Sequence, residues 1–159
     1  MIRVQAEDFD CAAEIRALTA GRDDIGAVVS FTGLVRRGDG DAAIRAMTLE
    51  HYPGMTEAEL ERIEAQARAR WTLSGCTIIH RHGRLAPGEN IVLVITASPH
   101  RRAAFEAAEF LMDYLKTDAP FWKKEELIQG DSNWVAANSS DDAAAERWRN
   151  NKATADKDG

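Results

Sequence analysis

Hydrophobic positions recur along the chain with two periods, and each period predicts a different kind of element. Alternating or continuous β-branched runs predict strands, and apolar residues at helical spacing predict helices. The expected strands are 2–6, 26–36, 44–52, 76–82, 90–97, 121–127 and a short one around 134–135. The expected helices are 10–20, 56–71, 99–117 and 139–148. Because this order contains hairpins as well as crossovers, the sequence predicts an α+β domain.

Local signals fix some boundaries and suggest one strand pair. Runs 26–36 and 44–52 are expected to be antiparallel neighbours, joined by the flexible polar loop 37–41. Thr56 and Glu59 have the spacing of a capping box that begins the second helix. Ser98 followed by Pro99 predicts the cap and first residue of the long helix.

Length and composition indicate one ordinary globular domain. Of the 159 residues, 1–149 are expected to form that domain, and the polar segment 150–159 is expected to be a disordered tail. A net charge of −6 argues against binding to nucleic acid or an anionic membrane. No apolar run is long enough for a membrane helix, and the start lacks a signal-peptide core, so a cytoplasmic protein is expected. Cys11 and Cys76 belong to no Cys-x-x-Cys pair and are interpreted as packing residues.

Two lysines flank the predicted end of the long helix. Lys116 falls in the last helical turn, Pro120 stops the helix, and Lys123 lies on the extended segment that follows. Two cations at such a junction can converge on one anionic ligand. The alternative is structural, because the helix dipole alone favours a lysine in the last turn and Lys123 can belong to a solvated charge run.

Further basic residues suggest anion binding elsewhere. His100 and Arg101 stand in the first turn of the long helix, where the dipole opposes positive charge unless an anion binds there. Arg36 lies where a strand meets a loop, and its guanidinium suits phosphate. The alternative is that these side chains extend into water. Arg101 and Lys116 are separated by about 22 Å along one helix, so a site that uses both requires a homodimer.

The chain offers few other catalytic groups. His80 and His82 share a strand face and His51 lies on another strand, which leaves a zinc site as an alternative, but we predict neither a metal nor a cofactor. No serine stands in a nucleophile-elbow motif. If the protein is an enzyme, its nucleophile is therefore expected to arrive with a substrate or partner.

At these residues the sequence resembles the large, catalytic subunit of molybdopterin synthase. The resemblance runs in order through about residues 25–135, and His82 departs from it where an apolar residue is expected. The matching motifs are Gly26-Ala-Val-Val-Ser-Phe-Thr-Gly-Leu-Val-Arg36, Leu49-Glu-His-Tyr-Pro-Gly-Met-Thr56, His80-Arg-His-Gly83, Ser98-Pro-His-Arg101, Ala104-Phe-Glu-Ala107, Met112-Asp-Tyr-Leu-Lys-Thr117 and Ala119-Pro-Phe-Trp-Lys123.

The resemblance implies a fold, a reaction and an assembly. The fold is an α/β hammerhead-like domain with an additional antiparallel β subdomain. The reaction transfers sulfur from the C-terminal thiocarboxylate of a small ubiquitin-like carrier subunit to cyclic pyranopterin monophosphate, which forms the dithiolene of molybdopterin. The assembly is a heterotetramer with a central homodimer of large subunits and a small subunit at each end.

The resemblance also implies residue roles. Lys116 and Lys123 are the catalytic pair, the first near the thiocarboxylate and the second near the pterin. Arg36 binds substrate phosphate, and His100 and Arg101 do so from the opposing subunit. Phe31 and Met112 line the pocket.

Three rival functions remain at the level of sequence. The chain can be a non-catalytic docking module for a ubiquitin-like tail, although docking needs no lysine pair. It can be a Schiff-base enzyme that uses Lys116, or a sensor that binds a pterin without turnover.

Overall fold

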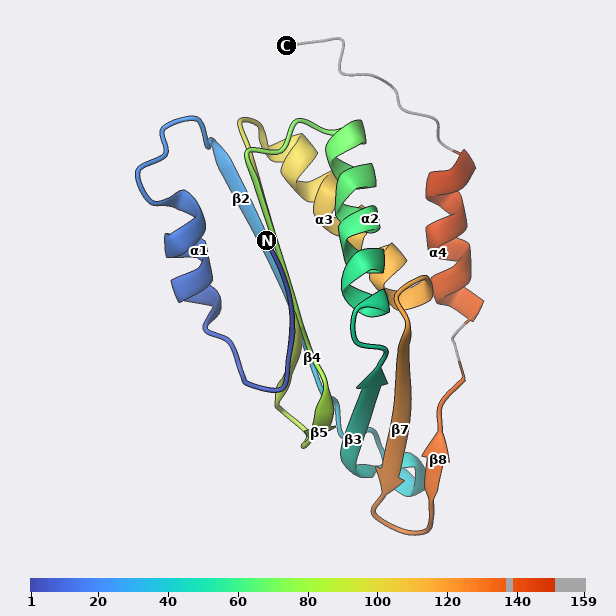
Figure 1. Ribbon diagram of the computed structural model, residues 1–159. Helices are drawn as coiled ribbons and strands as arrows, with labels where there is room; N and C mark the ends of the chain where they lie inside the picture. Colours follow the sequence, from blue (N-terminus) through green and yellow to red (C-terminus); the bar gives the residue numbers. More distant parts are fainter. Residues whose placement is uncertain (137–138, 151–159) are drawn as a thin grey trace.

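The computed structural model describes residues 1–136 and 139–150, which form two four-stranded sheets and four α-helices (Figure 1). The first sheet has the order β1-β4-β6-β2, in which only β1 and β4 are parallel. Its strands are β1 (Ile2–Gln5), β4 (Gly75–Arg81), β6 (Asn90–Ser98) and β2 (Ala27–Leu34). The second sheet, of order β5-β3-β7-β8, is antiparallel throughout. Its strands are β5 (Gly83–Leu85), β3 (Ile44–His51), β7 (Phe121–Leu127) and β8 (Ser132–Trp134). These elements confirm the predicted α+β class.

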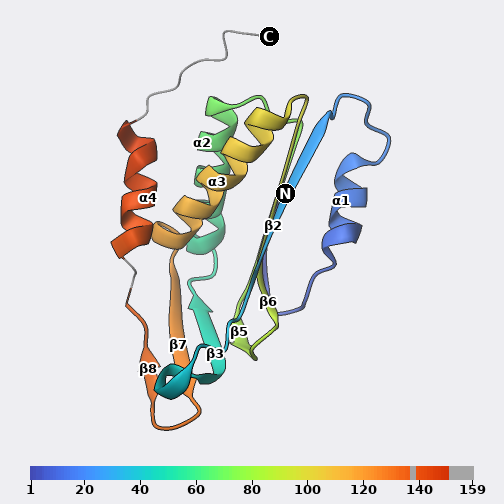
Figure 2. The ribbon, with the colours of Figure 1, turned by 180° about the vertical axis from the view of Figure 1, so that it is seen from behind.

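Helices cover both faces of the first sheet (Figures 1 and 2). Alternate strand residues explain this arrangement, since Ile78 and Val94 pack with the helices on one face while Ile79 and Ile95 pack on the other. One face carries α2 (Met55–Arg70) and α3 (Arg101–Thr117), and the other carries α1 (Cys11–Thr19). The fourth helix, α4 (Ser139–Asn150), packs against α3. The core is therefore layered, with the first sheet at its centre.

The predicted pairing of runs 26–36 and 44–52 is wrong. β2 pairs with β6 in the first sheet, whereas β3 pairs with β5 and β7 in the second. After β2 the chain is held at the β5–β6 loop, because the amide of Val35 donates to the carbonyl of Glu89 over 2.9 Å. The connection then contains the 3₁₀ turn Gly40–Ala42 and enters the other sheet. Closeness in sequence suggested a hairpin, but the chain uses this loop as a crossover.

Two predicted helix caps differ in detail. The second helix begins at Met55, and the carboxylate of Glu57 accepts a hydrogen bond of 2.6 Å from the backbone amide of Gly54. Thr56 is buried inside the first turn, where its hydroxyl accepts the amide of Tyr52. The long helix is capped at His100, whose amide donates to the Ser98 hydroxyl at 3.3 Å. The second helix therefore starts slightly earlier than its capping motif indicates, and the long helix slightly later. Both differences are within the usual range for helix ends.

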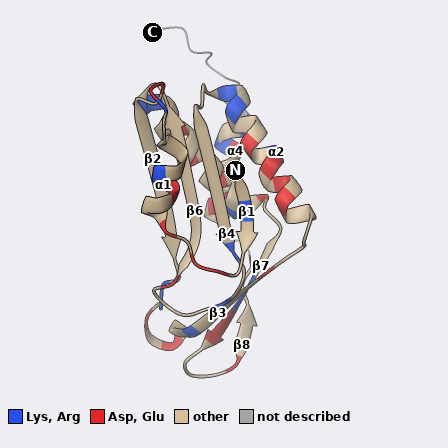
Figure 3. Cartoon of the chain, turned by 60° about the vertical axis from the view of Figure 1, so that its left-hand side comes forward, with Lys and Arg blue, Asp and Glu red and all other residues tan. Residues whose placement is uncertain are grey.

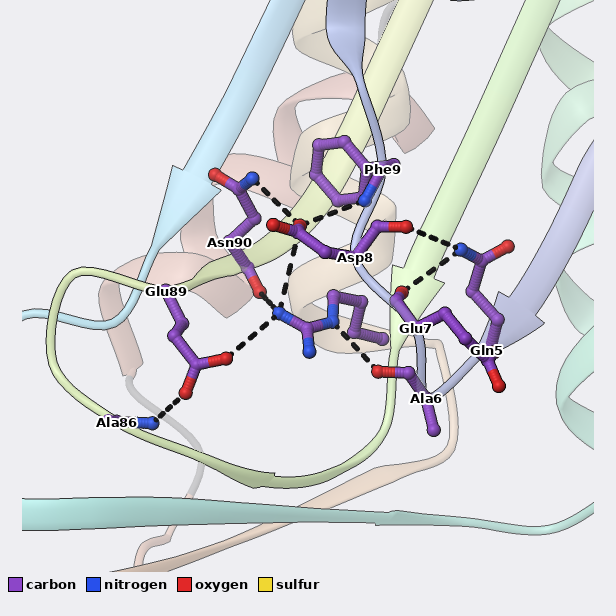
Figure 4. A network of polar contacts seen from close by, with 9 residues as sticks. Gln5, Ala6, Glu7, Asp8, Phe9, Ala86, Glu89 and Asn90 are labelled. Carbon is purple, nitrogen blue, oxygen red and sulfur yellow. Dashed lines mark hydrogen bonds and ion pairs between the residues drawn. The ribbon is translucent and has the colours of Figure 1, made fainter.

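A buried arginine ties three segments to the end of the first sheet (Figure 4). Arg81 is only 7% exposed and donates to the carbonyl oxygens of Ala6 and Asn90. Its guanidinium also pairs with Asp8 at 3.7 Å and Glu89 at 3.4 Å. A buried charge needs such partners, so this network joins the β1–α1 loop to the turn before β6.

The predicted tail 150–159 lies mostly outside the residues that the structure describes. Asn150, expected to open the tail 150–159, is the last residue of α4, and residues 151–159 lie outside the described part of the chain. No helix in residues 1–136 or 139–150 combines the length and apolar character needed to cross a membrane.

Candidate active site

The junction between α3 and β7 carries Lys116. This residue lies in the last turn of α3 and is exposed to solvent. The helix stops where the amide of Asp118 donates to the carbonyl of Tyr114 at 2.8 Å. β7 begins at Phe121, directly after Pro120. The predicted helix break is confirmed, and it leaves the Lys116 side chain at a free helix end.

Lys123 lies on the strand that leaves this junction. In the register of β7 with β3, Phe121 is opposite His51 and Lys123 is opposite Leu49. Because successive strand residues point to opposite faces, Lys123 and Phe121 share a face of the second sheet. Lys123 is half-buried there. The two lysines therefore flank the junction, one on the helix and one on the strand.

Among the residues that the structure describes, neither lysine has a carboxylate partner. Within residues 1–136 and 139–150, the ion pairs involve arginines, and none includes Lys116 or Lys123. An ammonium group that has no internal partner is available to an anionic ligand. This arrangement can bind and stabilise negative charge at the junction.

Histidine rings support the start of β7. The His80 ring stacks on Phe121 with centroids 3.6 Å apart, and the His51 ring lies 4.6 Å from that of His82. Burial lowers the pKa of His80 to about 4, so this ring is neutral at pH 7. Its Nδ1 donates to the carbonyl of Arg81 at 2.8 Å. The cluster thus packs behind the junction as a set of aromatic rings.

Within the part of the chain that the structure describes, the histidines belong to no group of side chains arranged to hold a metal ion. No three His, Cys, Asp or Glu side chains are arranged to hold a metal ion in the described ranges 1–136 and 139–150. Cys76 is buried, and desolvation raises the pKa of its thiol to about 12, so it stays protonated at neutral pH. The geometry agrees with a packing role for Cys76.

Phe31 and Met112 come from different elements of the same half of the protein. Phe31 lies on the edge strand β2, opposite Val94, and is 40% exposed. Gly33 makes room beside it, since a Cβ at this position would stand 3.4 Å from the Phe31 ring and 2.8 Å from Val92. Met112 lies on α3 and packs against the main core. Their predicted role as pocket-lining residues stays a prediction.

The remaining basic candidates separate into two groups. Arg36 follows the end of β2, and His100 and Arg101 stand at the start of α3. All three are exposed. β2 begins beside the end of β6, where the amide of Gly26 donates to the carbonyl of Ser98, and it runs away from the start of α3.

In this topology β2 and α3 both run away from the Ser98 end of the first sheet, so Arg36 and Lys116 lie away from that end and Arg101 lies at it. α3 is a continuous helix from Arg101 to Thr117, so its two ends are about 24 Å apart at a rise of about 1.5 Å per residue. Figures 1 and 2 show α3 running along the first sheet toward β7. Within one protomer, His100 and Arg101 are therefore not part of the group around Lys116.

Charges outside this group are mixed. In the view of Figure 3, α1 carries both acidic and basic residues, and α2 carries acidic residues along its length with basic residues in its last turn. The chain as a whole is acidic, with a net charge of −6.

Two features near the junction were not predicted from the sequence. A shallow pocket lies on the second sheet, lined by Glu50, His51, Tyr52, Trp122 and Trp134. The carboxylates of Asp113 and Asp118, on either side of Lys116, are held by groups from α2 and α4. Their partners are 31 to 56 residues away in the chain, and the sequence carries no local signal for such contacts.

Comparisons with known proteins identify the family of this chain. The family model described as "MoaE protein" matches residues 4–118. A molybdopterin synthase catalytic subunit from Mesorhizobium japonicum is 62% identical over 149 residues, covering 93% of this chain and 92% of that protein. The solved structure of molybdopterin cofactor biosynthesis protein E from Burkholderia multivorans superposes with a TM-score of 0.78. It is 51% identical and covers 94% of this chain and 96% of its own.

A more distant structure shares the fold. It is the complex of subunits 1 and 2 of the molybdopterin-converting factor from Helicobacter pylori, with a TM-score of 0.69 at 20% identity. The match covers 87% of this chain and 90% of that chain. Together, the family match and the long, highly identical relatives show that the chain belongs to the MoaE family, the molybdopterin synthase catalytic subunits, which are sulfurtransferases of molybdenum cofactor biosynthesis.

Proposed function

We propose that this chain transfers sulfur at the α3–β7 junction from the C-terminal thiocarboxylate of a small ubiquitin-like carrier subunit to cyclic pyranopterin monophosphate. The observation that carries the proposal is the pair of lysines that flank the junction without an internal ion pair in the described residues. Thiocarboxylate and cyclic phosphate are both anions, and positioned cations hold and stabilise such groups. Two transfers form the dithiolene and open the cyclic phosphate.

Each lysine has a separate role in this proposal. Lys116, exposed at the helix end, receives the incoming thiocarboxylate and stabilises charge that develops as sulfur leaves the carrier. Lys123, half-buried on the sheet face, contacts the pterin or its intermediate. Arg36, which like Lys116 lies away from the Ser98 end of the first sheet, binds the substrate phosphate, and Phe31 and Met112 give the pocket apolar walls. No metal or cofactor is assigned a step.

The position of Arg101 at the far end of α3 supports a homodimer with shared sites. A helix about 24 Å long prevents one small substrate from touching both Arg101 and Lys116 of one protomer. In a two-fold dimer, His100 and Arg101 of each protomer complete the site of the other. A carrier subunit at each end then gives a heterotetramer, in line with the two-subunit composition of the Helicobacter pylori complex.

The finer fold and location assignments are also proposals. The wholly antiparallel second sheet supports the additional β subdomain beside an α/β hammerhead-like domain. We treat residues 1–149 as a single domain and the cytoplasm as its location.

Sulfur transfer and site sharing can be tested together by complementation. Lys116→Ala and Arg101→Ala homodimers are each expected to be inactive with thiocarboxylated carrier and cyclic pyranopterin monophosphate. Random mixing of their subunits places one intact site in each heterodimer, and should restore about a quarter of wild-type product. Two inactive parents that give no activity after confirmed subunit exchange would contradict the shared site.

A further inference from the structure

The carboxylates nearest Lys116 in sequence are bound by side chains of other helices. Asp113 precedes Lys116 by three residues, and Asp118 follows it by two. An acid three or four residues before a lysine on one helix ordinarily forms an ion pair with it. Here both carboxylates pair with arginines instead, and no ion pair within residues 1–136 and 139–150 includes Lys116.

Asp113 is engaged from α4. Its Oδ2 accepts the indole N–H of Trp148 at 2.6 Å and the guanidinium of Arg147 at 2.9 Å. The Asp113 side chain is 18% exposed, so these contacts are partly shielded from water. The Trp148 ring is fixed in turn by edge-on contacts with Trp71 and Phe110, at centroid distances of 5.6 Å each.

Asp118 is engaged from both α2 and α4. Arg62 approaches its Oδ2 at 3.3 Å and Arg149 its Oδ1 at 3.5 Å. A carboxylate at the C-terminal end of a helix is opposed by the helix dipole, so it gains from these two cations. The partners Arg62, Arg147, Trp148 and Arg149 are called the carboxylate clamp below.

We propose that α4 positions the catalytic junction through this clamp, by holding the Asp113 carboxylate so that Lys116 stays unpaired and available to the anionic substrate. Arg147 and Trp148 are positioning residues in this account, because they act through Asp113 and touch no substrate. The proposal rests on the proposed role of Lys116. It also gives α4, which no predicted site residue occupies, a part in the chemistry.

The test releases Asp113 and then removes its charge. In the release variant, Arg147→Ala and Trp148→Phe together remove both donors while keeping an aromatic ring at 148. The freed carboxylate can then pair with Lys116. An exposed or partly exposed pair of this kind corresponds to about a two- to fivefold loss in the rate of molybdopterin formation. Adding Asp113→Asn to the release variant should restore the rate, since the amide carries no charge.

A matched control separates this effect from simple docking of α4. Arg147 also pairs with Glu109 at 2.9 Å, two helical turns before Lys116. Glu109→Gln weakens the attachment of α4 but leaves Asp113 clamped, so it should keep the wild-type rate. If Glu109→Gln loses as much activity as the release variant, or if Asp113→Asn fails to rescue, the clamp has a structural role only and the proposal is overturned.

A second readout does not depend on sulfur transfer. The full-length protein is treated with a limiting amine-reactive acetyl ester, and acetylation of Lys116 relative to Lys124 is measured by peptide mass spectrometry. Release should lower Lys116 labelling, and Asp113→Asn should restore it. Labelling that release does not change overturns the clamp. Full activity of Lys116→Ala would instead overturn the proposed function, and the labelling would still decide whether the clamp operates.

Discussion

The ring of His80 stacks on the ring of Phe121, with centroids 3.6 Å apart and planes inclined by 17°. This contact joins the second-last residue of strand β4 in the first sheet to the first residue of β7 in the second. Phe121 is two residues from Lys123 and shares its sheet face. The stack therefore connects the core of the protein to the strand that carries a proposed catalytic lysine.

Removal of the His80 ring is expected to loosen the start of β7. His80→Ala deletes a fully packed aromatic side chain, and a cost of about 2–4 kcal/mol in the free energy of unfolding is expected. Urea unfolding monitored by circular dichroism measures this cost. His82→Ala, at a half-buried neighbour, is the matched control and should lower the free energy of unfolding by less. Equal decreases for the two variants would mean that the stack on Phe121 adds no stability of its own.

The low pKa of His80 predicts a pH dependence of stability. Burial lowers this pKa from 6.5 to about 4, so between those values the unfolded chain binds a proton that the folded chain does not. The stabilisation that the neutral His80 ring gives the folded protein is fully present above pH 6.5 and is lost as the pH falls toward 4. The loss amounts to roughly 2–4 kcal/mol over that window.

Unfolding free energies at pH 7.5, 6.0, 5.0 and 4.5 test this dependence. His80→Gln removes the titrating group while it keeps a hydrogen-bond donor, so the difference between wild type and variant should shrink as the pH falls. A difference that stays constant across the range would show that His80 does not titrate as its burial requires.

The Arg81 network predicts a large effect of a buried charge. Arg81→Ala removes the guanidinium that donates hydrogen bonds to the Ala6 and Asn90 carbonyls. A loss of about 3 kcal/mol or more in the free energy of unfolding is expected. Arg22→Ala, which breaks the surface pair with Asp24, is the control and should cost much less, because exposed ion pairs contribute little to stability. Thermal unfolding of the two variants, measured side by side, tests whether Arg81→Ala lowers stability more than Arg22→Ala does.

The cysteines are predicted to be dispensable for sulfur transfer. Cys76 is 2% exposed and its raised pKa keeps it a thiol, and the sulfur in our account arrives on the carrier. The double variant Cys11→Ser, Cys76→Ser should therefore retain substantial activity if it folds. A folded double variant without any activity would place the sulfur chemistry on this chain instead.

The sequence predicted most of the elements because their signals are local. Pro120 marks the end of α3, and Gly130 and Asp131 mark the return to β8. The pairing of the strands was harder to predict, since β3 follows β2 in sequence but pairs with β5 and β7. The three-residue strand β5 was missed because a run this short has no period of its own.

The same distinction applies to the site. The residues Lys116, Lys123, Arg36, His100 and Arg101 stand out by type and by position at element ends, and the structure places each at such an end or beside the junction. The partners of Asp113 could not be foreseen, because Arg147 lies 34 residues away on a separate helix. Contacts of this kind depend on how α4 packs on α3, which the hydrophobic pattern does not specify.

The most direct test of the account is the yield of dithiolene product from this protein, thiocarboxylated carrier subunit and cyclic pyranopterin monophosphate, measured by mass spectrometry for wild type and Lys116→Ala. The account predicts product with the wild type and a loss of at least about 100-fold with Lys116→Ala, at unchanged fold and assembly. Product formation by a folded Lys116→Ala variant at the wild-type rate would contradict the placement of sulfur transfer at the α3–β7 junction.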